Sequence, residues 1–559
     1  MYIKKTTNRK GQAYYHLVES YRDHGKVRQR TLLSLGRVGD DRLDDLIAAI
    51  SRHKDIVSAM TAAKELSIEN TYILGPLLVL EHVFKFFGIS ALLNEIEEKH
   101  PRLKFNLSRI IFTLVVCRFI RPGSKLKVFE YWQDKLYPIM IAGKDELHHI
   151  YRALDLLADH KKEIEKGLFW LRRDLLNTNI DVVLYDLTTL RFESTREDLG
   201  ELRRFGYSKE MRSDCTQVVL GLLLDTEGIP LGFEVYPGNT FEGSTLPDIV
   251  EKMRKKFSVR RFIFVADRGL FSSKNLESIR SNCGIDDKNG EFIVGMKLGQ
   301  IKKRHNEFYD IHRFRSISEE LFVYETTHEG DRCIITWSQK RADRDKKTRE
   351  DILGKIRKKL TGNSNGKSFV SNSNYKKYVS GLEKGTPQLN DKAIEEEAKK
   401  DGFFGVITNI SKDKMSASEI IGAYKNLWII EDAFGEIKGS LKARPVFHWT
   451  DHRILGHLTM CFLAYFCEAQ ITRQLRQANI DLNSHAINQK IIKSRPLTVV
   501  EVMRELAEVR AVPVKLKGNI AWVRTDIGGN ATKLFRGIGV AIPPKLLTIT
   551  SPSPNQENP

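Results

Sequence analysis

Cysteine is scarce in this sequence, and long apolar segments are absent. Its 559 residues include six cysteines, none of them in a C-x-x-C pair, which argues against a disulfide scaffold. The longest apolar stretch, about ten residues from Leu458 to Cys467, is too short to span a bilayer. The N-terminal MYIKKTTNRKGQ lacks the apolar segment of a secretory signal. These absences predict a cytoplasmic protein without a membrane span.

Positive charge dominates the composition. Lys and Arg number 90 and Asp and Glu 71, which gives a formal net charge of +19. Apolar residues make up 41% and charged residues 29%, which is ordinary globular usage and excludes disorder of the whole chain. At about 150 residues a domain, the length predicts roughly three to four domains. The excess of positive charge favours nucleic acid as the partner, with a merely basic surface as the alternative.

The first 40 residues differ in pattern from those that follow. Two alternating runs flank the turn signal Asp23-His24-Gly25, which predicts a β-hairpin region over residues 1–40. Residues 41–179 have the periodicity of helices, with basic residues interleaved. This pattern predicts a helical DNA-binding domain, and an ordinary helical domain with solvated Lys and Arg side chains fits it equally well.

The pattern changes again at residue 180, where short apolar runs typical of strands begin. We expect a mixed α/β sheet, because these runs first follow tight turns and then alternate with helical segments. The predicted segments are a first part of the core at 180–299, an insertion with a mobile basic surface at 300–400, a second part of the core at 401–475, a C-terminal α/β region at 476–545 and a disordered tail at 546–559.

Two of the strand-like runs are each followed by an aspartate. Asp186 follows Asp181–Tyr185, and Asp267 follows Arg261–Ala266. An acidic side chain at the carboxyl end of a buried strand points to the crevice where open α/β sheets bind ligands. Either aspartate alone is more often a turn or cap residue, but two of them in one sheet predict a shared site.

A third carboxylate lies on a helix predicted over 416–440, which begins with a capping-box pattern. Tyr424, Glu431 and Lys438 are spaced seven apart, so on one helix they form a single stripe. Glu431 then falls on the face that is expected to be apolar and packed. Burial of an ionised carboxylate there is costly unless the group is paired with Arg or Lys, or coordinates a metal.

Three carboxylates from two strands and a packed helix indicate a site for hard divalent cations. Mg²⁺ is bound by a few carboxylates together with waters and phosphate oxygens of the substrate. Two such ions can activate an attacking oxygen and stabilise the leaving one in an in-line phosphoryl displacement. With a net charge of +19, the phosphate is expected to belong to a nucleic-acid backbone.

These residues also carry a family resemblance. The sequence resembles the DDE transposases of bacterial insertion sequences, in particular an IS-four-like group whose third motif reads Tyr-x2-Arg-x3-Glu-x6-Lys. The resemblance covers roughly residues 180–470. Its three motifs are YDLTTL around Asp186, VADRGL around Asp267, and Tyr424-KNLWII-Glu431-DAFGEI-Lys438.

The resemblance implies an α/β fold with a ribonuclease-H-like mixed sheet and helices, a β-rich insertion between the second aspartate and the glutamate, and a flanking helical domain. It also implies a catalytic triad that holds two divalent cations, Mg²⁺ or Mn²⁺. The triad residues would be Asp186, Asp267 and Glu431.

By the same resemblance, the partner is double-stranded DNA, as terminal inverted repeats and as target. Tyr424 and Lys438 would contact the DNA near the cleaved end, and Arg444 in the following GSLKARPVFHW is a further candidate contact. Leu427 stands where the motif has Arg, so a phosphate contact there has to come from elsewhere, for which the adjacent Lys425 is a candidate. A homodimer in a synaptic complex is expected, in a cytoplasmic protein associated with the nucleoid.

The implied function is metal-dependent cleavage at the ends of an insertion sequence, followed by strand transfer into target DNA. Two other functions fit the residues. The chain could be a non-catalytic, sequence-specific DNA-binding protein that retains the fold, although all three acidic positions are filled. It could also be a ribonuclease-H-like nuclease that cleaves without joining strands.

Overall fold

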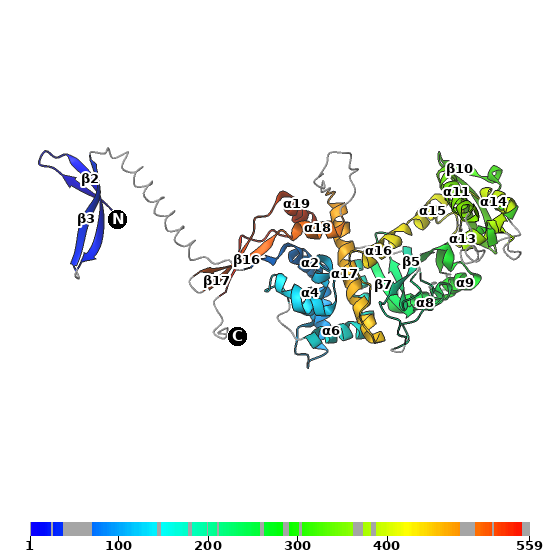
Figure 1. Ribbon diagram of the computed structural model, residues 1–559, viewed down its shortest axis with the longest axis horizontal. Coiled ribbons are helices and arrows are strands. Elements are labelled where there is room, and N and C mark those ends of the chain that lie inside the picture. Colours follow the sequence, from blue (N-terminus) through cyan, green and yellow to red (C-terminus); the bar gives the residue numbers. More distant parts are fainter. Residues whose placement is uncertain are drawn as a thin grey trace. The chain divides into compact units, whose positions relative to one another are not determined.

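The computed structural model describes most of the chain, and Figure 1 shows its elements. The described residues are 2–23, 26–36, 70–141, 147–176, 182–197, 200–208, 212–257, 262–282, 290–300, 305–361, 373–381, 387–480, 498–516 and 519–550. The chain divides into two compact units. One comprises Met1–Thr71, Ala511–Arg524 and Pro544–Pro559, and the other Tyr72–Arg510 and Thr525–Pro543.

The first unit contains the hairpin that the N-terminal pattern predicted. Strands β1 (Tyr2–Thr7), β2 (Ala13–Asp23) and β3 (Lys26–Gly36) form an antiparallel sheet in that order. Asp23, the last residue of β2, pairs with Lys26, the first residue of β3. The basic side chains of this hairpin are exposed, at Arg22, Lys26, Arg28 and Arg30. They therefore give the hairpin a solvent-facing positive charge.

Three further antiparallel strands follow near the C-terminus: β16 (Arg510–Leu516), β17 (Asn519–Arg524) and β18 (Leu546–Thr550). The first two lie in the predicted C-terminal α/β region. β18 corrects the prediction of a disordered tail over 546–559, because its residues continue the pairing of β17. The last nine residues of the tail, 551–559, lie outside the described residues.

The second unit contains a helical part built around α17 (Asp451–Gln477). This helix contacts α2, α4, α6, α18 and α19, so it lies at the centre of the bundle (Figure 1). The helices predicted within 41–179 are present from residue 75 onward, and 41–69 lie outside the described residues. The bundle helices are α2 (Gly75–Phe86), α3 (Ile89–Glu98), α4 (Leu107–Ile120), α5 (Lys125–Lys127), α6 (Leu147–Asp159), α7 (Lys161–Leu176), α18 (Val499–Leu506) and α19 (Gly529–Ile538).

By length and composition alone, α17 is apolar enough to cross a membrane. Within the fold, however, 89% of its most apolar window is buried. The buried residues include polar side chains such as His457, Glu468 and Gln470, which are costly to place in lipid. Both observations are those expected of a core helix.

A nine-stranded mixed sheet completes the second unit, in the order β10-β11-β12-β15-β9-β8-β5-β6-β7. β8 runs parallel to β5 and to β9, and the other neighbouring pairs are antiparallel. The mixed α/β sheet predicted from residue 180 onward is therefore confirmed. Its strands are β5 (Val182–Arg191), β6 (Gln217–Leu224), β7 (Pro230–Pro237), β8 (Ile263–Ala266), β9 (Glu291–Gly295), β10 (Arg315–Ser318), β11 (Leu321–His328), β12 (Asp331–Trp337) and β15 (Phe403–Thr408).

The core of the sheet is apolar on the face that the helices cover. α8 (Leu246–Phe257) and α9 (Ser273–Asn282) pack there. Ile249 and Ile279 from these helices join Phe264 and Phe292 from the strands, and all four side chains are at most 1% exposed. This burial fixes the central strands β5 and β8, which carry the acidic motifs.

Residues 300–400 contribute strands to the core sheet as well as helices. β10, β11 and β12 extend that sheet through β15, rather than forming a sheet of their own. The basic stretch 340–359, predicted to be a mobile surface, lies in a 23-residue helix, α11 (Gln339–Thr361). Leu353 and Ile356 anchor α11 in a small apolar cluster with Tyr378 and Val379.

The segment also contains several smaller elements. They are α10 (His305–Phe308), α13 (Ser373–Lys376), β13 (Val379–Ser380), β14 (Gln388–Leu389) and α14 (Asp391–Ala398). The Asn/Ser/Gly-rich residues 362–372 lie outside the described residues.

The helix predicted over 416–440 is two helices, α15 (Ala417–Lys425) and α16 (Trp428–Lys438). The predicted capping box is confirmed. Glu419 N donates to Ser416 Oγ at 3.3 Å, and Ser416 N donates to Glu419 Oε2 at 2.7 Å.

The break between the two helices overturns the single stripe. Leu427 N donates to Tyr424 O three residues back, at 3.1 Å, and Ile429 N donates to Asn426 O. Such i−3 bonds tighten the chain and end a regular α-helix. Tyr424 therefore lies on α15, and Glu431 lies on α16.

Candidate active site

Asp186 lies inside β5 rather than after it. The sequence VVLYDLTTLR is rich in β-branched and aromatic residues, which favour a strand. The prediction that this strand ends at Tyr185 is wrong, because its antiparallel pairing with β6 continues to Arg191. Its parallel pairing with β8, however, ends where Tyr185 meets Ala266. Asp186 is therefore at the carboxyl edge of the parallel part of the sheet.

Asp267 directly follows Ala266, the last residue of β8. The register of Tyr185 with Ala266 places the next residue of each strand at the same edge of the sheet. Asp267 begins a short 3-10 turn, Arg268–Leu270, and is exposed. The structure thus brings Asp186 and Asp267 together, although the connections between their strands are long.

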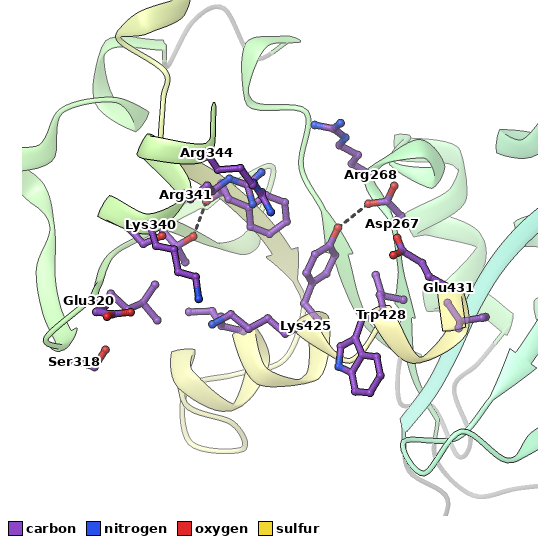
Figure 2. A pocket seen from close by; sticks show the side chains of 18 of the residues that line it. Asp267, Arg268, Ser318, Glu320, Lys340, Arg341, Arg344, Lys425, Trp428 and Glu431 are labelled. Carbon is purple, nitrogen blue, oxygen red and sulfur yellow. Dashed lines mark hydrogen bonds between the residues drawn. The ribbon is translucent and has the colours of Figure 1, made fainter. Parts of the chain in front are cut away.

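Glu431 reaches the same place from α16, which contacts β5. The expectation that Glu431 is packed on an apolar face is wrong, since its side chain is exposed. The buried face of α16 consists of its neighbours Ile430, Ala433, Phe434 and Ile437. Glu431 borders this face and projects into an open cavity instead. Figure 2 shows its carboxylate directed toward that of Asp267.

The three carboxylates line one cavity of about 800 Å³. One wall is the edge of the core sheet with α16. The opposite wall comes from the segment between the second aspartate and the glutamate, where β11, β12 and α11 contribute Leu321, Thr336 and Lys340. The cavity is therefore large enough to admit a polymer segment beside the acids.

Tyr424 lies against Asp267 rather than on an outer surface. Its hydroxyl donates to Asp267 Oδ1 at 2.7 Å. Burial, followed by the negative charge of Asp267, raises the pKa of Tyr424 far above its usual range, so the hydroxyl keeps the proton that it donates. The approach depends on Gly295 at the end of β9, because a Cβ atom there would lie 2.5 Å from Tyr424 Oη.

Five basic side chains also line the cavity, and sequence reasoning singled out only Lys425 among them. Figure 2 shows those from α11 across the cavity from Asp267 and Glu431. The signal available in the sequence was the dense Lys/Arg stretch that follows the strand at 331–337, but its position beside the acids follows only from the fold. The five residues are Arg268, Lys340, Arg341, Arg344 and Lys425.

Arg341 is the most constrained of these cations. Its guanidinium lies 4.7 Å from the centre of the Phe404 ring, and its Nε is 3.6 Å from the Asp345 carboxylate. Burial lowers the pKa of Arg341, but a guanidinium stays protonated in proteins. Arg341 therefore holds a fixed positive charge at the cavity wall.

Of the three remaining motif and candidate positions, one lines the cavity and two do not. Leu427 lines the cavity and is buried, and it contributes no charge. Lys438 ends α16, two turns beyond Glu431, and Arg444 is half-buried in the following loop. Neither Lys438 nor Arg444 is among the described residues that line the cavity.

The donor set fits hard divalent cations. Carboxylate oxygens suit Mg²⁺, which keeps several waters and takes further ligands from substrate phosphates. Within the described residues, the hydrogen bond that the Asp267 carboxylate accepts comes from a neutral hydroxyl, that of Tyr424. Within the described ranges, no three His, Cys, Asp or Glu side chains stand close enough to enclose one ion. An open set of carboxylates of this kind leaves coordination positions for water and for phosphate oxygens of a substrate.

Two family models match the chain. Residues 3–63 match the description "IS1634 family transposase, N-terminal domain". Residues 177–467, more than half of the 559-residue chain, match "Transposase DDE domain". No curated protein matches the chain. The second match contains all three carboxylates of the cavity, together with α11, α15 and α16.

Proposed function

Because the chain belongs to the family of transposases with a DDE domain, we propose that it cleaves DNA at the ends of an insertion sequence and transfers the freed strands into target DNA. The observation that carries this proposal is the meeting of Asp186, Asp267 and Glu431 in one cavity with five basic side chains. This combination matches a reaction in which a phosphodiester is bound and an attacking oxygen displaces one of its ester oxygens.

We assign the three carboxylates as ligands of two divalent cations, Mg²⁺ or Mn²⁺. When bound, such ions supply activation of the attacking oxygen and stabilisation of the leaving oxygen. Water is the attacking group in cleavage, and the 3′-hydroxyl of the cut strand is the attacking group in transfer. Arg268 and Arg341 line the same cavity and place positive charge where a bound phosphate would lie.

The strand arrangement supports a ribonuclease-H-like core. In the order β7-β6-β5-β8-β9, the first three strands are antiparallel and the last three run parallel. The first acid lies on the central strand β5, and the second follows β8 beside it. The insertion then supplies the basic wall of the site.

The chain is proposed to hold DNA through the cations of that wall and through Trp428. The indole of Trp428 lines the cavity and is 51% exposed, so it offers a surface on which an unpaired base can stack. Lys438 and Arg444 lie outside the cavity and are proposed to contact the duplex farther from the cut. Two copies are proposed to hold two ends in a synaptic complex, in the cytoplasm at the nucleoid.

Tyr424 is proposed as a positioning residue for Asp267. Tyr424→Phe removes the 2.7 Å bond to Asp267 Oδ1 and leaves that carboxylate free to rotate. Loss of such an outer contact typically costs about 10-fold to 100-fold in metal affinity or activity. We therefore expect cleavage by Tyr424→Phe to require roughly 10-fold more Mg²⁺ for half-maximal rate, measured by titrating Mg²⁺ in a cleavage assay.

The matched control for this prediction is Tyr236→Phe. It removes a similar bond, from the Tyr236 hydroxyl to Asp248 Oδ2 at 3.0 Å, between residues that do not line the cavity. An unchanged Mg²⁺ requirement in Tyr424→Phe would remove this residue from the metal site.

The experiment that tests the proposed function is cleavage of a labelled duplex that carries the element's own ends, with Mg²⁺ or with EDTA. Nicking at the ends that requires Mg²⁺ supports the assignment. Cleavage without subsequent joining to a target would favour the nuclease, and tight binding without nicking would favour a DNA-binding protein.

A further inference from the structure

A second cavity, of about 210 Å³, lies between the helical bundle and the loop that links α16 to α17. Three of its lining side chains are cationic: Arg118 from α4, Lys125 from α5 and Arg453 from α17. No carboxylate is among the described residues that line it. The cavity of the three acids shares none of these lining residues.

Lys125 is the centre of this cluster and is 4% exposed. Its Nζ lies 2.6 Å from Nδ1 of His457, which is also buried. Nε2 of His457 lies 3.0 Å from the carbonyl oxygen of Ala443, so Nε2 carries the ring proton and Nδ1 accepts from Lys125. A neutral imidazole orients the Lys125 Nζ and brings no negative charge to it.

Arg118 is likewise held by groups that carry no charge. It is 6% exposed, and its Nη1 donates to the carbonyl oxygens of Lys442 at 3.0 Å and Leu441 at 3.4 Å. Within the described residues, neither Arg118 nor Lys125 forms an ion pair with a carboxylate. Arg453 does pair with Asp155, with 3.3 Å between Nε and Oδ1.

The surroundings of the cluster respond to this positive charge. Burial, and then the charges of Lys125, Arg118 and Arg453, lower the pKa of His448 to about 3. Burial, and then Lys125, Arg118 and His448, also depress the pKa of His457. Burial and Arg118 lower the pKa of Lys125. A buried cation without a counter-charge is unfavourable, and an anion that entered the cavity would remove this cost.

We propose that this cavity binds a backbone phosphate of DNA, held by Lys125, Arg118 and Arg453. The cavity is smaller than the roughly 300–1,000 Å³ typical of pockets for drug-sized ligands, so it suits a single phosphate group rather than a whole nucleotide. Arg and Lys side chains are the usual partners of DNA phosphates. The inference rests on the proposed function, because it assumes that DNA is the substrate.

The rim of the cavity favours DNA over a free phosphate ion. Phe447 and Trp449 line the cavity, yet they are 60% and 49% exposed. The Trp449 ring is fixed by the Arg203 guanidinium, 5.0 Å from its centre. Exposed rings beside a cationic pocket can contact sugars and bases. A free phosphate ion has neither group and would gain no such contact.

The position of the cavity is also suited to DNA that occupies the first site. Val446, in the loop beside the cavity, donates its N–H to the carbonyl oxygen of Arg191 at 3.2 Å. Arg191 ends the strand that carries Asp186. Five strand residues span roughly 17 Å, which is about five base pairs of duplex. One DNA molecule can therefore reach both cavities.

The test is the salt dependence of DNA binding by the full chain in EDTA, with a 30-base-pair duplex as the probe. Lys125→Met removes the charge and keeps the length of a buried side chain, and Lys127→Met removes an exposed charge from the same short helix. We expect Lys125→Met to weaken binding about tenfold and to lower the slope of log K against log salt by about 0.9. Lys127→Met should leave both values nearly unchanged.

Three results would overturn the proposal. The first is an unchanged slope in Lys125→Met with its melting temperature preserved, and the second is an equal change in Lys127→Met, which would indicate net charge alone. The third is loss of thermal stabilisation by inorganic phosphate in Lys125→Met while DNA affinity stays constant, which would indicate a free phosphate ligand. If Lys125→Met fails to fold, Phe447→Ala, a surface change, tests the site instead. It should weaken DNA binding, and unchanged binding would contradict the proposal.

The test separates the two proposals. A wild-type protein that binds no DNA at all would contradict the proposed function. A protein that binds and cleaves DNA, with Lys125→Met behaving as wild type, would contradict this inference alone.

Discussion

Glu431→Gln is expected to lower the rate of DNA cleavage by about 10³-fold or more, because it removes one anionic ligand from the proposed metal site, whose carboxylates would act as a unit. The amide has nearly the same shape as the carboxylate, and Glu431 is exposed in the cavity rather than packed in the core. The fold and the affinity for DNA should therefore stay within a few-fold of wild type.

The measurement is the rate of nicking of an end-bearing duplex at saturating protein, together with the Kd for that duplex in EDTA. Asp432→Asn is the matched control, since Asp432 is the adjacent exposed carboxylate on α16 and does not line the cavity. Equal loss of cleavage in both variants would indicate a general effect of charge on α16. Loss of DNA binding by Glu431→Gln alone would make its role structural.

The second large effect is expected from the basic wall of the same cavity. Replacing Arg341 and Arg344 together with Ala should weaken DNA binding about tenfold or more and lower the salt slope by about 1.8, the value for two lost phosphate contacts. Both side chains line the cavity across from the acids. The motif of the resembling family has Arg at the position of Leu427, which carries no charge. Arg341 and Arg344 would supply positive charge in its place.

The control for this pair is Lys346→Ala with Lys347→Ala. These exposed lysines lie on the same helix α11 and do not line the cavity. Binding curves at several salt concentrations measure both quantities. If the control pair lowers the salt slope as much as the arginine pair does, the effect belongs to the charge of α11 as a whole rather than to the cavity.

The strand pattern was sufficient to find the two aspartates, because each follows a short run of buried residues. Their exact placement was not predictable from these runs. The pairing of Tyr185 with Ala266 joins strands that are 81 positions apart, and local sequence does not encode such a register. The β5 strand also continues beyond Asp186 because β6 pairs with it, which is again a long-range contact.

The seven-residue spacing indicates Glu431 as a site residue, but the structure contradicts the reason. The seven-residue spacing predicts a packed glutamate only on one continuous helix. The chain instead turns after Tyr424, and Glu431 is exposed. Seven-residue spacing is informative only along an unbroken helix, and the i−3 bonds at Asn426 and Leu427 depend on packing that the spacing does not show.

The basic wall was the least predictable part of the site. Its charge density is visible at 340–359, but such runs are usually solvated surface. α11 reaches the acids because β12 pairs with β15, as in the pairing of Ile334 with Val406. This pairing brings the start of α11 next to α15, and only the folded sheet reveals it.

The most direct measurement is the fate of a labelled duplex that carries the element's own ends, incubated with the wild-type chain and a supercoiled target plasmid in Mg²⁺ or in EDTA. We expect nicking at the ends and covalent joining of the label to the plasmid in Mg²⁺, and neither product in EDTA. Tight binding of the ends with no nicking in Mg²⁺ or Mn²⁺ would contradict the assignment of Asp186, Asp267 and Glu431 as a catalytic metal site.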